Sequence, residues 1–261
     1  MQKIFIYRDV GADAACVASL VAELRRHVGD AYHIAWADRH LLCRPEWQRE
    51  AALLIFPGGR DVPYHRALQG VGNAHIREFV ERGGSFLGLC AGGYYGSATV
   101  EFERGRPLEV VAERELKFFP GVARGPAYGL GEFEARSERG ARVAQLHVMG
   151  GEEPTVSAAY YHGGCAFVDA DAYPTVSVLA RYAELHEQPA AIVRCRVGQG
   201  WAILSGVHPE YCAMHGVSVV PTMSRSMREA LHAVEPQRDA LFKCLLMHVG
   251  CAQVASRPCT S

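Results

Sequence analysis

A cysteine in a glycine-rich turn is the strongest candidate for covalent chemistry in this sequence. Residues 85–89 are apolar and predict a short strand, Cys90 follows directly, and Gly92 and Gly93 open a predicted helix. A sharp strand-to-helix turn places a side chain beyond the end of a sheet, beside backbone N–H groups that stabilise a thiolate and an oxyanion. Cys90 is therefore predicted to be a nucleophile, although burial in a core is the commoner fate of a free cysteine.

A second motif, H-P-E at residues 208–210, contains the groups that would activate such a cysteine. It follows a predicted strand, and the fixed φ of Pro209 holds His208 and Glu210 in a defined relation. An imidazole within reach of Cys90 can take the thiol proton, while Glu210 orients the ring and supports its positive charge. We therefore predict a Cys90, His208 and Glu210 triad. A histidine at a strand end is more often merely hydrogen-bonded, so this prediction depends on the combination of motifs.

The first hundred residues predict a doubly wound α/β unit. Apolar segments predict strands at residues 3–7, 32–37, 51–56 and 85–89, and helical spacing predicts helices at 13–28 and 73–81, the latter capped by Asn73. This alternation is typical of a parallel sheet with helices on its faces. The P-G-G at 57–59 and Cys90 both follow strands, so we expect them to face one crevice at the carboxyl edge of the sheet.

The pattern changes beyond residue 108, where Gly and Pro turns separate short apolar segments. Strands are predicted at residues 141–148, 155–161, 166–168, 175–182, 190–197 and 201–204, and helices at 224–234 and 236–249. The first four of these strands predict an antiparallel extension of the sheet, and the last two predict a hairpin that leads into the H-P-E motif. No repeat or linker interrupts the chain, so we predict one domain over residues 1–255 and a disordered tail at 256–261.

Composition excludes several classes of protein. The chain has 261 residues, 49% of them hydrophobic, with 27 Lys and Arg against 28 Asp and Glu, so no global charge predicts a nucleic-acid or membrane partner. The sequence starts on a strand without a signal-peptide pattern, and its nine cysteines do not resemble a disulfide framework, which predicts a cytoplasmic protein. Close Cys and His pairs are few and no C-x-x-C occurs, so neither a metal site nor a cofactor is predicted.

The motifs together resemble a known superfamily. P-G-G at 57–59, G-L-C-A-G at 88–92 and H-P-E at 208–210, in this order, are similar to the class I glutamine amidotransferases. Further segments resemble the biotin-protein ligase N-terminal-like family over essentially the whole chain. These segments are F-P-G-G-R-D-V-P-Y (56–64), L-C-A-G-G-Y-Y-G-S (89–97), V-E-F-E (100–103), F-F-P-G (118–121) and G-P-A-Y (125–128).

The resemblance implies a flavodoxin-like α/β fold, with a doubly wound, mostly parallel sheet, helices on both faces and an antiparallel strand extension. It implies Cys90 as nucleophile, His208 as base and Glu210 as the residue that orients the base. By the same resemblance, the backbone N–H groups of Gly59 and Ala91 match the donors of the oxyanion hole.

One position departs from the pattern of the glutamine-hydrolysing members. They usually carry Gln four residues after the nucleophile, where this chain has Tyr94. Tyr94 and Arg60 both flank the expected crevice and are predicted to bind the substrate. Packing of the tyrosine and local pairing of the arginine are the alternatives. The short R-G-R at 104–106 is interpreted as a solvated turn and not as the adenylate loop of a biotin ligase.

The sequence leaves two kinds of function open. The first is a cysteine-dependent amidohydrolase or amidotransferase that acts on a small amide or acyl substrate. The alternative is a non-catalytic module that keeps the fold and binds a metabolite or a partner. The complete triad favours the enzyme, because a binding site has no need of Glu210 behind His208. Redox sensing by Cys90 is a minor alternative, and the sequence leaves open the substrate and whether the chain forms a homo-oligomer or binds a partner protein.

Overall fold

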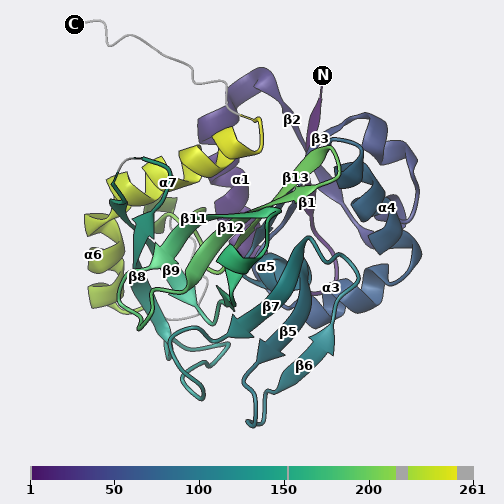
Figure 1. The fold of residues 1–261 in the computed structure, drawn as a ribbon. Coiled ribbons are helices and arrows are strands. Elements are labelled where there is room, and N and C mark those ends of the chain that lie inside the picture. The colour runs from purple at the N-terminus through teal and green to yellow at the C-terminus, as the bar shows by residue number, and fades with distance from the viewer. Residues whose placement is uncertain (1, 152, 216–222, 252–261) are drawn as a thin grey trace, which may run out of the picture.

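The computed structural model describes residues 2–151, 153–215 and 223–251. The predicted tail at 256–261 lies outside the described residues. All thirteen strands in the described part of the chain belong to one sheet, and helices pack on both of its faces (Figure 1). The expected α/β architecture, with a parallel half and an antiparallel extension, is confirmed.

The parallel half of the sheet contains the strands that the sequence predicts. Their order is β2 (His33–Ala37), β1 (Lys3–Tyr7), β3 (Ala51–Phe56), β4 (Ser85–Leu89) and β13 (Gly200–Ser205). The chain passes from β1 to β2 at the edge and then returns to β3 on the other side of β1. In sheets of this kind, ligands bind beyond the carboxyl ends of the strands, where the strand order reverses.

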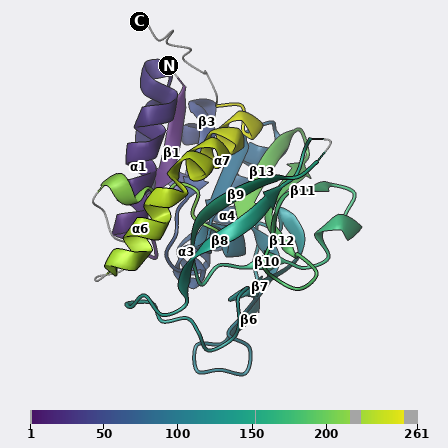
Figure 2. The ribbon, with the colours of Figure 1, turned by 90° about the vertical axis from the view of Figure 1, so that its left-hand side faces the viewer.

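The central strands are buried on both faces, which explains their continuous apolar sequences. In β3, Leu54 and Phe56 belong to one hydrophobic cluster, and Leu53 and Ile55 belong to the other. The first cluster is covered by α3 (Asp61–Leu68) and α4 (Val71–Glu81), and the second by α1 (Ala14–Val28) and α7 (Glu235–His248). Figures 1 and 2 show these helices on opposite sides of the sheet.

The prediction of a cap at Asn73 is wrong. Helix α4 begins at Val71 after Gly70, and Asn73 lies inside it, buried. Its Nδ2 donates to Glu115 Oε2 at 2.6 Å, and its Oδ1 accepts a hydrogen bond from the Tyr95 hydroxyl. The side chain therefore bonds to partners distant in the sequence instead of to the N–H groups of its own helix. Helix α3 was not predicted at all.

The second half of the sheet is largely antiparallel. β12 (Ala190–Val197) pairs with β13 in the predicted hairpin, and the sheet continues through β10 (Ala166–Phe167), β7 (Phe119–Gly125), β5 (Ser97–Phe102) and β6 (Val110–Glu113). A branch runs from β12 through β11 (Val176–Tyr182) and β8 (Ala141–Val148) to β9 (Thr155–His162). Sequence reasoning missed β5, β6 and β7, and β5 pairs with β7 in parallel.

The remaining elements are short. They are the α-helices α2 (Arg39–Leu42), α5 (Ala91–Tyr95) and α6 (Arg225–Ala233), and the 3-10 helices η1 (Gly29–Ala31), η2 (Glu46–Arg49), η3 (Ala170–Ala172) and η4 (Ala213–His215). Helix α6 begins after Ser224, whose hydroxyl accepts from the Met227 N–H. Within the described residues, no helix has both the length and the apolar character needed to cross a membrane.

Candidate active site

Cys90 lies in the turn between β4 and α5, as its sequence context predicts. Its backbone has φ 49° and ψ −99°, an unusual conformation for a residue with a Cβ. The Cys90 N–H donates to the Ser205 carbonyl at 2.8 Å, which joins the turn to the end of β13. Only 7% of Cys90 is exposed. The turn therefore fixes the thiol in a nearly enclosed position beyond the carboxyl end of β4.

The glycines around Cys90 are required because other backbone segments lie against them. A Cβ built on Gly88 would lie 2.3 Å from the Gly92 carbonyl oxygen, and one on Gly92 would lie 2.3 Å from that of Phe56. A Cβ on Gly93 would lie 2.7 Å from the Ser205 carbonyl oxygen. Three strands and the start of α5 can therefore pack around Cys90 only because these side chains are absent.

His208 and Glu210 follow β13, the strand next to β4. His208 Nδ1 lies 2.8 Å from Glu210 Oε1, and the two residues are 4% and 0% exposed. The His208 N–H donates to the Tyr160 carbonyl at 2.8 Å, which fixes the backbone of the motif against β9. With Nδ1 engaged by Glu210, Nε2 is the ring nitrogen left to interact with Cys90.

The pKa of His208 reflects both neighbours. Burial is the largest influence and lowers the pKa, but the electrostatic interactions with Cys90 and Glu210 and the side-chain hydrogen bonds to them raise it well above its ordinary value. A raised pKa favours the imidazolium form of His208. This form can hold a thiolate at Cys90 and can later donate a proton to a leaving group.

His162 also lies beside Cys90. Cys90 Sγ is 3.8 Å from the His162 carbonyl oxygen, and His162 Nε2 is 3.2 Å from the carbonyl oxygen of Arg139. Burial, and then the charge of His208, lowers the pKa of His162. The neutral form of His162 is therefore favoured, and its backbone forms one wall of the site.

The P-G-G loop forms the opposite wall. A Cβ on Gly58 would lie 2.6 Å from Cε1 of His208, so the loop lies directly against the imidazole. The Gly58 carbonyl accepts from the Asp13 N–H at 3.0 Å, and the Arg60 N–H donates to the Gly11 carbonyl at 2.9 Å. Gly59, between them, has φ +146°. Backbone hydrogen bonds on both sides thus hold the Gly59 N–H in a fixed orientation. Ala91 is the first residue of α5, so its N–H has no partner within the helix.

The two predicted substrate-binding residues lie in different environments. Arg60 is exposed and directly precedes α3. Tyr94 is 5% exposed, and its hydroxyl donates to the Gly163 carbonyl at 3.0 Å. Burial raises the pKa of Tyr94 well above its ordinary value. The structure therefore brings Cys90, His208 and Glu210 together, leaves Arg60 at the surface and packs Tyr94 into the wall.

Sequence reasoning missed residues that line the site from distant segments. Tyr160 is fully buried with its ring 5.7 Å from that of His208, and the Ser19 hydroxyl donates to the Glu210 carbonyl at 2.9 Å. Alternating apolar residues predicted a strand around Tyr160, but no local signal indicates that this strand lies beside His208. These contacts depend on the order of the strands and not on the sequence around each residue.

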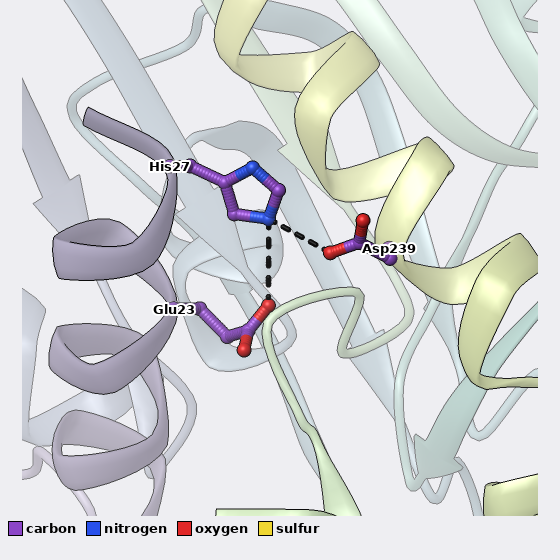
Figure 3. Close-up of side chains that lie close together, drawn as sticks. All are labelled: Glu23, His27 and Asp239. Atoms are coloured by element: carbon purple, nitrogen blue, oxygen red, sulfur yellow. Dashed lines mark hydrogen bonds and ion pairs between the residues drawn. The ribbon is translucent and has the colours of Figure 1, made fainter. Parts of the chain in front are cut away.

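One group of potential metal ligands lies close together in the described part of the chain. It consists of Glu23 and His27 on α1 and Asp239 on α7 (Figure 3). Arg26 donates to Glu23 Oε2 at 2.8 Å, and Arg238 donates to the same oxygen at 2.7 Å. Guanidinium groups already neutralise the carboxylate that a metal ion would need, so this group is better explained as an ion-pair network.

Comparison with known proteins identifies the family. The family model described as "Biotin-protein ligase, N terminal" matches residues 2–260. The chain belongs to this family. The resemblance drawn from the motifs at 56–64, 89–97, 100–103, 118–121 and 125–128 is thereby confirmed.

Relatives within the biotin-protein ligase N-terminal family differ in length. An uncharacterized protein of Chlamydia muridarum (strain MoPn / Nigg) is 36% identical over 262 residues, which cover 95% of this chain and 97% of that protein. A biotin–protein ligase of Schizosaccharomyces pombe (strain 972 / ATCC 24843) is 39% identical over 213 residues. That match covers 80% of this chain but 33% of the ligase.

Solved structures share the fold at low identity. A glutamine amidotransferase crystal structure superposes with a TM-score of 0.55 at 19% identity, covering 88% of this chain and 98% of that one. The PurLQS structure from Thermotoga maritima gives a TM-score of 0.55 at 14% identity, covering 95% and 99%. This member of the biotin-protein ligase N-terminal family therefore has a glutamine amidotransferase-like fold.

Proposed function

We propose that this protein is a cysteine-dependent amidohydrolase or amidotransferase that forms a thioester between Cys90 and a small amide or acyl substrate. The observation that carries the proposal is the buried pair of His208 and Glu210. Glu210 engages Nδ1 of the His208 ring, and the other ring nitrogen, Nε2, is left to interact with the enclosed thiol of Cys90. A nucleophile, a base and an oriented carboxylate are the groups that cysteine and serine triads use for acyl transfer.

In the proposed reaction, His208 accepts the Cys90 proton and the sulfur attacks the substrate carbonyl carbon. The carbonyl electron pair moves onto oxygen, and the resulting oxyanion accepts hydrogen bonds from the N–H groups of Gly59 and Ala91. Each such donor contributes roughly a hundred- to a thousandfold in rate. The carbon–nitrogen bond then breaks, and His208 gives its proton to the departing amine. Water, deprotonated by His208, cleaves the thioester and restores the thiol.

The buried position of Tyr94 supports the alternative of a binding module. Its hydroxyl is already bonded to Gly163, and glutamine-hydrolysing relatives of the fold usually carry Gln there. A module of this kind would bind a metabolite or a partner protein without turnover. Arg60, exposed at the rim, could contact a carboxylate in either case.

Mass spectrometry of the Cys90 peptide, after incubation with a panel of small amides that includes glutamine, tests the proposal. We expect an acyl adduct on Cys90 with at least one amide, and a fall in kcat/KM of about a hundredfold or more in His208→Gln. Full turnover by Cys90→Ala would overturn the proposal. Binding of a panel member that is equally tight in Cys90→Ala, with no adduct in the wild type, would favour the binding module.

A further inference from the structure

The ion-pair network between α1 and α7 continues to the H-P-E motif. Figure 3 shows Glu23, His27 and Asp239, with His27 Nε2 lying 3.6 Å from Glu23 Oε2 and 2.9 Å from Asp239 Oδ1. Arg238 joins this group from α7 and donates to Glu23. The network therefore extends beyond a surface contact between two helices.

Arg238 is the most deeply buried cation of the network, at 1% exposure. Its Nε and Nη2 donate to the two carboxylate oxygens of Glu235 at 2.8 and 2.7 Å, and Nη2 also donates to Glu23 Oε2 at 2.7 Å. Burial lowers the pKa of Arg238, but the hydrogen bonds and charges of Glu235 and Glu23 raise it above its ordinary value. The side chain is therefore held in one orientation by charged partners on two helices.

The remaining donor of Arg238 is directed at the motif. Nη1 donates to the Pro209 carbonyl at 2.5 Å, and this peptide group lies between His208 and Glu210. Proline has no N–H, so the carbonyl is the only backbone group of Pro209 that a hydrogen bond can hold. On the next residue, the Ser19 hydroxyl donates to the Glu210 carbonyl. The carbonyls of Pro209 and Glu210 are therefore fixed from α7 and α1, respectively.

We propose that Arg238 is a positioning residue for the reaction. It fixes the Pro209 carbonyl. Through this carbonyl it holds the His208 ring in position against Cys90 and the Glu210 carboxylate in position against the ring. This inference rests on the proposed function. Arg238 acts through the backbone and touches neither the thiol nor the substrate.

Energetics favour a role in geometry over one in stability alone. A buried ion pair returns little net stability, because desolvation of the charges offsets most of their attraction, and apolar residues of similar volume often serve as well. Small misplacements of catalytic groups, by contrast, cost large factors in rate. The buried carboxylate of Glu23 and the partly exposed carboxylate of Glu235, which together hold one guanidinium against the Pro209 carbonyl, therefore suit a positioning role.

The test compares Arg238→Met, Arg238→Lys and the control Asp239→Asn in the full chain. Asp239 lies on the same helix and bonds to Arg26 and His27, and its own contact with Arg238 Nη2 is long, at 3.5 Å. The readout is the rate of Cys90 alkylation by iodoacetamide between pH 5 and 9, followed on the Cys90 peptide, with thermal unfolding measured in parallel. His208→Gln defines the rate that remains without the base.

We expect Arg238→Met to lose about tenfold or more of the alkylation rate at pH 6 and to approach the His208→Gln pH profile. Asp239→Asn should keep the wild-type profile. The ammonium group of Arg238→Lys can reach the same carbonyl, so it should restore most of the rate even if unfolding occurs at a lower temperature. A wild-type profile in Arg238→Met overturns the inference.

If Arg238→Met does not fold, the alkylation profiles of Arg238→Lys and Asp239→Asn test the inference instead. An alkylation profile lost equally in both would show that the network acts only through general stability. Failure of the proposed function gives a different result. In that case the wild type itself alkylates no faster than His208→Gln at any pH.

Discussion

His208 Nδ1 lies 2.8 Å from Glu210 Oε1, and neither residue is more than 4% exposed. Within the described residues, Glu210 Oε2 is buried and lacks a hydrogen-bond partner. The imidazole is therefore the principal group that can compensate the negative charge of Glu210. The same contact orients the opposite ring nitrogen toward Cys90.

Replacement of Glu210 by Gln removes this charge at nearly constant volume. We expect the pKa of His208 to fall, because burial lowers it and one of the two negative charges that raise it is gone. An NMR titration of the His208 ring measures the shift. Glu229→Gln, which breaks an exposed ion pair with Arg225, is the control and should leave the titration unchanged. An unaltered His208 pKa in Glu210→Gln would contradict the assignment.

Gly92→Ala should destabilise the protein although Gly92 lies in a helix, where alanine is normally favoured by about 1 kcal/mol. The new Cβ would meet the Phe56 carbonyl oxygen at 2.3 Å, and overpacking of this kind costs about 1–3 kcal/mol. Urea unfolding measures the change. Gly105→Ala meets no atom within 4 Å and has only a positive φ of +74° to accommodate, so it should cost less. Equal stability of Gly92→Ala and the wild type would disprove the crowding argument.

Tyr94→Phe should lower the free energy of unfolding by about 1–2 kcal/mol, because the buried Gly163 carbonyl loses its donor. The matched control is Tyr32→Phe. The Tyr32 hydroxyl donates to the Gly250 carbonyl at 3.4 Å in an exposed position, so its loss should change stability by no more than about 0.5 kcal/mol. Equal effects of the two substitutions would show that the Tyr94 hydroxyl has no special role in the wall.

His162→Gln should weaken the acid sensitivity of the fold. Burial and the charge of His208 lower the His162 pKa, so the unfolded chain, with a histidine pKa of about 6.5, binds more protons than the folded chain just below that pH. Stability contributed by neutral His162 is therefore present above about pH 6.5 and is lost as pH falls toward the folded-state pKa.

Urea unfolding between pH 5 and 7 checks this expectation. The slope of unfolding free energy against pH should be shallower in His162→Gln than in the wild type. It should not vanish, because burial also lowers the pKa of His65 and His248. His186→Gln, at an exposed position, should keep the wild-type slope. An identical slope in His162→Gln would indicate that the side chain does not stay neutral in the folded state.

The sequence by itself determined the parallel half of the sheet and the local form of the site. Continuous apolar runs such as residues 51–56 and 85–89 predict buried strands, and the glycines beside Cys90 predict a tight turn, because both depend on neighbouring residues. The relation of His208 to Glu210 is also local, since only Pro209 separates them. The family followed from the same motifs.

Only the tertiary structure decided which distant groups meet at Cys90. The parallel pairing of β4 with β13 brings Ser205 beside Leu89 and so places the residues that follow these strands side by side. The side-chain directions of Tyr94, toward Gly163, and of Arg238, toward Pro209, follow from packing between segments that no local pattern connects. Periodicity in a sequence specifies elements and their buried faces, whereas strand order and helix docking specify contacts between elements. The candidate nucleophile was therefore readable from the sequence, and the residues that hold its partners in place were not.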